Sequence, residues 1–171
     1  THGASGPRLI FMLWQTSRFL MDLAVPHVMG IVNVTPDSFS DGGVFAGAGA
    51  AAAHCERMVA EGADLLDIGG ESTRPGAGAP GLQEELARVM PVIGHAVTLG
   101  VPVSVDTSRA EVMAAALAAG ADVVNDVRAL GQPGALEVVA APARCGVCLM
   151  HRRGGPGTMR REPHYGDVVI E

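Results

Sequence analysis

The sequence predicts an α/β protein in which parallel β-strands alternate with helices. Short runs rich in Val, Ile and Leu recur along the chain, and a stretch of small residues suited to a helix follows each of them. The runs are nearly continuous in apolar character, which is typical of parallel strands covered on both faces. Strand–helix alternation with right-handed crossovers produces a parallel sheet, either open or closed.

The expected elements follow in chain order. Residues 1–8 are expected to be tag residues or a disordered terminus, and residues 9–171 to form one domain. Segments 9–13 and 18–23 are expected to form a β-hairpin. Strands are predicted over 28–34, 64–68, 101–106, 122–127 and 146–151. Helices are predicted over 48–61, 83–99, 109–119 and 134–140.

A weak internal repeat supports this assignment. The segment EGADLLDI, which begins at Glu61, resembles AGADVVND, which begins at Ala119. In both, a glycine, Gly62 or Gly120, is expected to end a helix just before a strand begins.

Polar side chains stand near the carboxyl ends of the predicted strands. Asn33, Asp106, Asn125 and His151 occupy such positions. A (β/α)₈ TIM barrel presents its chemistry at this edge, and the hairpin would then close the opposite face. A full barrel needs eight strands and about 250 residues, so this chain is expected to hold about the first five β/α units, an incomplete barrel.

Composition excludes several classes of protein. The net charge is −6, and no basic stripe suggests nucleic-acid binding. The sequence contains no run of 18 apolar residues, so it predicts no membrane span. Three cysteines make no disulfide framework in a chain of this size, which favours a reducing, cytoplasmic location. All twelve basic residues are arginine.

The loop after the first predicted sheet strand, residues 33–43, concentrates polar chemistry. It carries hydroxyl and carboxylate oxygens on Thr35, Asp37, Ser38 and Asp41, together with the aromatic Phe39. A solvated turn rarely combines such donors with a lone aromatic, so a ligand-contacting loop is favoured.

The second such loop, residues 69–77, combines two glycines with Ser72, Thr73 and Arg74. Glycines allow a ligand to approach the backbone closely, and an arginine fork beside hydroxyls suits phosphate or carboxylate. The alternative is a surface arginine in a turn.

Asp106 and Asn125 end neighbouring predicted strands. Together they suit hydrogen bonding to the edge of an amino-pyrimidinone ring, because a carboxylate accepts paired N–H donors and an amide both donates and accepts. The alternative is that Asp106 serves as a helix cap, alongside Thr107 or Ser108.

Two motif matches are rejected. Residues 76–81 fit G-x-G-x-x-G but lie well beyond their strand and contain Pro80. Cys145 and Cys148 fit C-x-x-C without a second pair, and we expect buried strand cysteines instead. His54 and His95 are interpreted as ordinary helix residues, whereas His151 is a better site candidate.

Five segments in this order resemble the dihydropteroate synthase family: GIVNVTPDSFSDGG, DIGGESTRPGA, SVDTS, VVNDV and VCLMH. The resemblance covers the chain from about Phe11 onward. It implies a (β/α)₈ barrel, usually a homodimer, that condenses 4-aminobenzoate with 7,8-dihydropterin methyl diphosphate with the help of Mg²⁺. Sulfonamides compete for the 4-aminobenzoate site.

The resemblance also implies residue roles. Asp106 and Asn125 would hydrogen-bond the pterin ring, with Met150 packing beneath it. Asn33 would contribute to Mg²⁺ and diphosphate binding, and with Arg74 and Asp106 it makes the expected catalytic set. The side chains expected around 4-aminobenzoate and the anion are Ser38, Phe39, Thr73, Arg74 and Pro75.

The family also places an Asp, a Lys, an Arg and a His at positions that would lie beyond Glu171, so the chain is expected to be part of a longer protein. Two alternatives stay open. One is a pterin-binding methyltransferase of the same fold, which the two loops disfavour. The other is a non-catalytic barrel that binds pterin or serves as a scaffold.

Overall fold

The computed structural model describes residues 12–35, 43–71, 79–151, 166–167 and 169–170. Its centre is a five-stranded parallel sheet in which neighbouring strands follow one another in the sequence. The strands are β3 (Met29–Asn33), β4 (Leu65–Gly69), β5 (Val103–Asp106), β6 (Val123–Asp126) and β7 (Gly146–Leu149). Sequential parallel order is the arrangement of successive barrel units, so the predicted fold is confirmed for these five strands.

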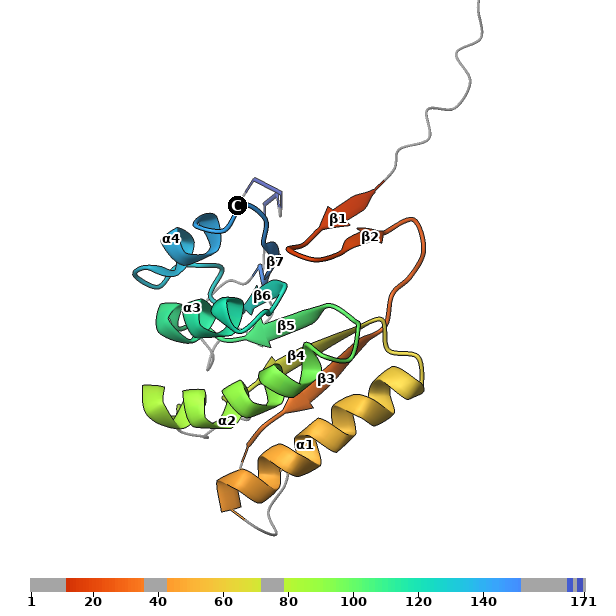
Figure 1. The fold of residues 1–171 in the computed structure, drawn as a ribbon. Helices are drawn as coiled ribbons and strands as arrows, with labels where there is room; N and C mark the ends of the chain where they lie inside the picture. Colours follow the sequence, from red (N-terminus) through yellow and green to blue (C-terminus); the bar gives the residue numbers. More distant parts are fainter. Residues whose placement is uncertain (1–11, 36–42, 72–78, 152–165, 168, 171) are drawn as a thin grey trace, which may run out of the picture.

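Four helices alternate with the strands and lie on one face of the sheet (Figure 1). They are α1 (Gly43–Ala60), α2 (Leu82–Ala96), α3 (Ala110–Ala118) and α4 (Ala135–Ala140). The core lies between these two layers. Its strand residues include Val32, Leu66, Ile68, Val105 and Val124, all fully buried. These side chains alternate with residues that face the other side of the sheet.

Two helix boundaries differ by more than one residue from those predicted. Helix α1 begins at Gly43, earlier than residue 48; its first turns contain Gly43 and Gly47, and glycine is a poor helix former, so the sequence favours a later start. Helix α2 ends at Ala96 rather than at 99. After it the hydrogen bonds become 3₁₀-type: the amides of Thr98 and Leu99 donate to carbonyls three residues back, both at 3.0 Å.

The repeated glycine stops are confirmed. Gly62 and Gly120 have φ of +102° and +101°, a left-handed conformation that favours glycine. After α1, the amide of Ala63 donates to the Met58 carbonyl at 2.9 Å; after α3, that of Ala121 donates to Ala116 at 3.0 Å. Both helices therefore end in the same hydrogen-bonded motif and turn directly into a strand.

The N-terminal hairpin is present, with its first strand later than predicted. Strands β1 (Leu13–Gln15) and β2 (Leu20–Asp22) pair antiparallel. The predicted first strand was 9–13, and residues 9–11 lie outside the described part of the chain. A Cβ added to Gly146, the first residue of β7, would lie 3.2 Å from the Trp14 ring and 3.1 Å from Thr16. The hairpin therefore packs against the amino end of the sheet, opposite the carboxyl ends, as expected.

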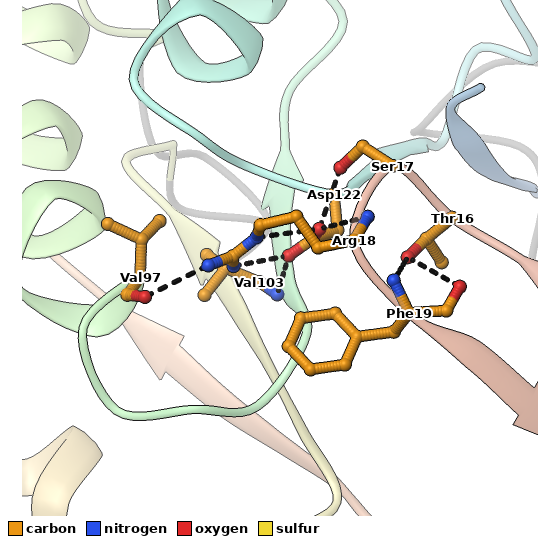
Figure 2. A network of polar contacts seen from close by, with 7 residues as sticks. All are labelled: Thr16, Ser17, Arg18, Phe19, Val97, Val103 and Asp122. Atoms are coloured by element: carbon orange, nitrogen blue, oxygen red, sulfur yellow. Dashed lines mark hydrogen bonds and ion pairs between the residues drawn. The ribbon is translucent and has the colours of Figure 1, made fainter. Parts of the chain in front are cut away.

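A buried carboxylate holds the hairpin in place (Figure 2). Asp122, fully buried just before β6, accepts hydrogen bonds from Ser17 Oγ at 2.7 Å and from Arg18 Nη2 at 2.6 Å. It also accepts from the Val103 amide at 3.0 Å, and Arg18 Nη1 donates to the Val97 carbonyl at 3.0 Å. One acid thus joins the hairpin to the starts of β5 and β6.

Within the described residues, no helix has the length and apolar character needed to cross a bilayer.

Candidate functional site

The carboxyl ends of the five strands align in one row. The pairing register places Asn33 opposite Gly69, Gly69 opposite Asp106, Asp106 opposite Asn125, and Asn125 opposite Cys148. Partners in register point to the same side of a sheet, here the side away from the helices. Neighbouring strands lie about 4.8 Å apart, so Asp106 and Asn125 are adjacent and Asn33 stands two strands from Asp106. Asn33, Asp106 and Asn125 thus lie in one row at the carboxyl edge of the sheet.

Met150 directly follows β7 and is half-buried. Its amide donates to the Asp126 carbonyl at 3.4 Å, which ties the end of β7 to β6. His151 comes next and is exposed. Both residues therefore stand at the same edge of the sheet as Asp106 and Asn125.

Asp106 is surrounded by negative charge. The pKa of its carboxyl group is raised to about 7, first by burial and then by the negative charges of Asp67, Glu71, Asp126 and Glu85, in that order. Gly69 leaves space beside it, since a Cβ there would lie 3.4 Å from Asp106 Oδ2. A ligand that brings N–H donors or positive charge is expected to stabilise the ionised form of this buried carboxyl group.

A second acid, Asp67, lies on the same side of the sheet, two residues before Gly69 on β4. It is 2% exposed, and its Oδ2 accepts a hydrogen bond from Asn125 Nδ2 at 2.9 Å. Its other oxygen, and the fully buried hydroxyl of its register partner Ser104, have no hydrogen-bond partner among the described residues. Asp67 was given no role from the sequence. The available signal was an acid between two apolar residues, Leu66 and Ile68, within a buried strand.

Side chains of α2 and of the segment after β5 hold the chain just before and just after residues 72–78. Before it, Arg88 Nη1 donates to the Gly70 carbonyl at 2.8 Å. After it, Arg109 Nη2 donates to the Pro80 carbonyl at 2.7 Å, while Arg109 Nε lies 2.9 Å from Oε2 of the fully buried Glu85. Gly70 and Pro80 are therefore fixed to the helix layer.

The segments that carry the other expected site residues lie outside the described part of the chain. These residues are Ser38, Phe39, Thr73, Arg74 and Pro75.

Two local predictions are wrong. Neither Thr107 nor Ser108 caps α3, whose N-cap residue is Arg109 without a side-chain cap. Thr107 Oγ1 instead donates to Glu85 at 2.5 Å, and Ser108 Oγ donates to Asp126 at 2.6 Å. Cys145 and Cys148 were both expected to be buried strand residues. Cys145 is half-buried just before β7, and Cys148 is exposed, because it lies on the uncovered side of the last strand described.

Comparison with known proteins agrees with this geometry. A family model described as "Pterin binding enzyme" matches residues 29–171. A dihydropteroate synthase of Neisseria meningitidis serogroup B is 53% identical over 161 residues, which cover 93% of this chain and 56% of that protein. The chain thus spans just over half the length of this relative.

Solved structures agree in fold. The Xanthomonas albilineans dihydropteroate synthase with 4-aminobenzoic acid has a TM-score of 0.80 and 55% identity, covering 94% of this chain and 57% of that one. The Yersinia pestis dihydropteroate synthase in a sulfonamide drug complex has a TM-score of 0.80 and 48% identity, covering 93% and 58%. With a family model that matches from β3 onward and a polar row at the strand ends, the chain belongs to the pterin-binding enzyme family.

Proposed function

We propose that the protein containing this chain is a dihydropteroate synthase, which joins 4-aminobenzoate to 7,8-dihydropterin methyl diphosphate and releases diphosphate. The observation that carries the proposal is the pairing of Asp106 with Asn125 at the carboxyl edge, on the side of the sheet away from the helices. The relatives that match most of this chain are dihydropteroate synthases, and one of them was solved with 4-aminobenzoic acid.

The proposed reaction forms a C–N bond and breaks a C–O bond. The amine nitrogen of 4-aminobenzoate attacks the pterin methylene carbon, diphosphate leaves with the C–O electron pair, and the amine proton passes to solvent. The aromatic amine is already neutral at pH 7, so no strong general base is needed. What the protein must supply is orientation and charge stabilisation.

The roles of the strand-end residues follow from their chemistry. Asp106 accepts N–H donors of the ring, and these donors favour its ionised form. Its negative charge then stabilises positive charge that develops on the pterin methylene as the leaving group departs. Asn125 pairs with the neighbouring ring edge, and Met150 packs beneath the ring.

Mg²⁺ is proposed as the cofactor. Asn33 has an exposed side chain at the end of β3, and an amide oxygen suits a cation that usually keeps several waters and binds substrate phosphates. The bound ion would neutralise charge on the departing diphosphate. Among the described residues no group of three His, Cys, Asp or Glu side chains gathers around a metal position, so Asn33 would share the ion with diphosphate oxygens and water.

Further assignments rest on the resemblance. Thr73, Arg74 and Pro75 are proposed to lie around 4-aminobenzoate and the anion, with Ser38 and Phe39 beside them. We also propose a homodimer, and sulfonamides as competitors of 4-aminobenzoate, since a sulfonamide complex is known for the Yersinia pestis relative.

The test is pyrophosphate release by the natural full-length protein. Release that requires both substrates and Mg²⁺ supports the synthase. A protein that binds pterin but releases no pyrophosphate contradicts it and favours a non-catalytic pterin-binding barrel. Calorimetric titration with a sulfonamide in the presence of pyrophosphate separates the remaining alternative, because a pterin-binding methyltransferase has no need of an aminobenzoate pocket.

A further inference from the structure

Asp67 stands where it can control how Asn125 meets a ligand. We propose that Asp67 is a positioning residue that fixes the orientation of the Asn125 amide and so selects which hydrogen-bonding edge of the ring the site accepts. The inference rests on the proposed function, because it concerns the same pterin site.

The contact is unusual in its reach. Asp67 lies on β4 and Asn125 on β6, with β5 between them, so their 2.9 Å hydrogen bond crosses the face of the intervening strand. Asp67 is 2% exposed, so little water competes for the bond. A buried, charge-assisted bond of this kind holds its partner more firmly than an exposed one.

The bond decides the polarity of the amide. A carboxylate accepts hydrogen bonds and cannot donate them, so only the Nδ2 end of Asn125 can face Asp67. A flipped amide would place its oxygen against the Asp67 carboxylate and leave both unpaired. Asn125 therefore offers a ligand its carbonyl oxygen and one remaining N–H. That pair matches a ring edge in which a donor stands beside an acceptor, which a dihydropterin has.

Asp67 has a second connection to the site. Its charge is the first of the charges that raise the pKa of Asp106, after burial itself. The other charges that act on Asp106 are those of Glu71, Asp126 and Glu85. Removal of the Asp67 charge should therefore lower the pKa of Asp106, an effect that a purely structural role for Asp67 would not produce.

A double-mutant cycle tests the proposal. The affinity of the natural full-length protein for 7,8-dihydro-6-hydroxymethylpterin is measured by calorimetry for the wild type, Asp67→Asn, Asn125→Ala and the double variant. We expect Asp67→Asn to weaken binding about tenfold, the equivalent of one charge-assisted hydrogen bond. In the Asn125→Ala background the same change should cost less than about twofold, because there is no amide left to orient.

The control is Asp64→Asn, the same substitution just before β4, where Asp64 accepts from the Val28 amide at 2.7 Å. It should leave affinity within about twofold of the wild type. Circular dichroism melting checks that each variant folds, and Asp67→Ser takes the place of Asp67→Asn if that variant does not.

Additive losses in the cycle would overturn the role of Asp67 and leave the proposed function intact. An unchanged pH dependence of binding in Asp67→Asn would also overturn it. A wild-type protein that binds no pterin would refute the proposed function, and this inference with it. Strong coupling between the Asp67 and Asn125 substitutions, together with a midpoint of pterin binding at lower pH in Asp67→Asn, supports the role.

Discussion

The link between the hairpin and the sheet depends on one buried carboxylate, and Asp122→Asn tests its contribution to stability. The substitution keeps the shape of the side chain but replaces one acceptor oxygen by an NH₂ group. One carboxylate oxygen accepts from Arg18 Nη2 and the Val103 amide, and the other from Ser17 Oγ and Arg18 Nε. The Arg18 amide also donates to the second oxygen, at 3.3 Å, so at least two donors lose a charged acceptor whichever oxygen is replaced.

The expected cost follows from these contacts. A lost hydrogen bond to a charged group costs about 1.5–3 kcal/mol, and removing one partner of a buried ion pair costs about 3–5 kcal/mol. The Arg18 side chain is 38% exposed, so water replaces part of what it loses. We therefore expect the free energy of unfolding to fall by about 3 kcal/mol, near the lower end of the range for buried pairs.

The effect should depend on pH. Burial acts to raise the pKa of Asp122, but hydrogen bonds from Arg18, Ser17 and Val103 outweigh it, so the pKa lies below its ordinary value. The stabilisation is therefore complete above about pH 4, the ordinary aspartate value, and is lost as pH falls through the lowered pKa. The difference between wild type and variant should shrink over the same interval.

The assay is urea unfolding followed by circular dichroism at pH 7 and at stepwise lower pH. Glu61→Gln, an exposed change just after α1, is the control and should alter stability by less than about 0.5 kcal/mol. A loss below about 1 kcal/mol for Asp122→Asn at pH 7, or a loss that does not vary with pH, would refute the reasoning.

Three further predictions concern the site and its support. Pterin affinity should fall about tenfold for each pH unit below 7, because only ionised Asp106 accepts the ring's donors; calorimetry should show this slope in the wild type and its absence in Asp106→Asn. Gly70→Ala should lower the free energy of unfolding by about 1–3 kcal/mol, because the new Cβ would lie 2.9 Å from Val89 Cγ1; an unchanged urea midpoint would contradict that packing. Removal of Mg²⁺ with EDTA should abolish pyrophosphate release and leave binding of the diphosphate-free pterin alcohol within about twofold; equal loss of both would argue against a role for the ion on the diphosphate.

The parts of the fold that local sequence determines were predictable. Apolar runs marked all five strands of the sheet, and the glycines at 62 and 120 marked the ends of two helices. Asp106 and Asn125 were identified because each is a polar residue that ends a run of apolar ones. Parallel strands bring such ends together, so their proximity followed from the fold class alone.

The contacts that could not be predicted join residues far apart in the sequence. Thr107 is of a residue type that often caps helices, yet its hydroxyl donates to Glu85, a buried acid on α2. The bond from Asn125 to Asp67 depends on the register of three strands, which no local pattern specifies. Asp122 pairs with Arg18 across most of the chain, and neither residue has a sequence signal that points to the other.

The position of the ring is the central claim, and a crystal structure of the natural full-length protein with bound 7,8-dihydro-6-hydroxymethylpterin tests it most directly. The account predicts two ring N–H groups within hydrogen-bond distance of the Asp106 carboxylate. It also predicts the Asn125 carbonyl oxygen facing the ring, with its Nδ2 still on Asp67. A ring bound elsewhere, or an Asn125 amide turned so that its nitrogen faces the ring alone, would contradict it.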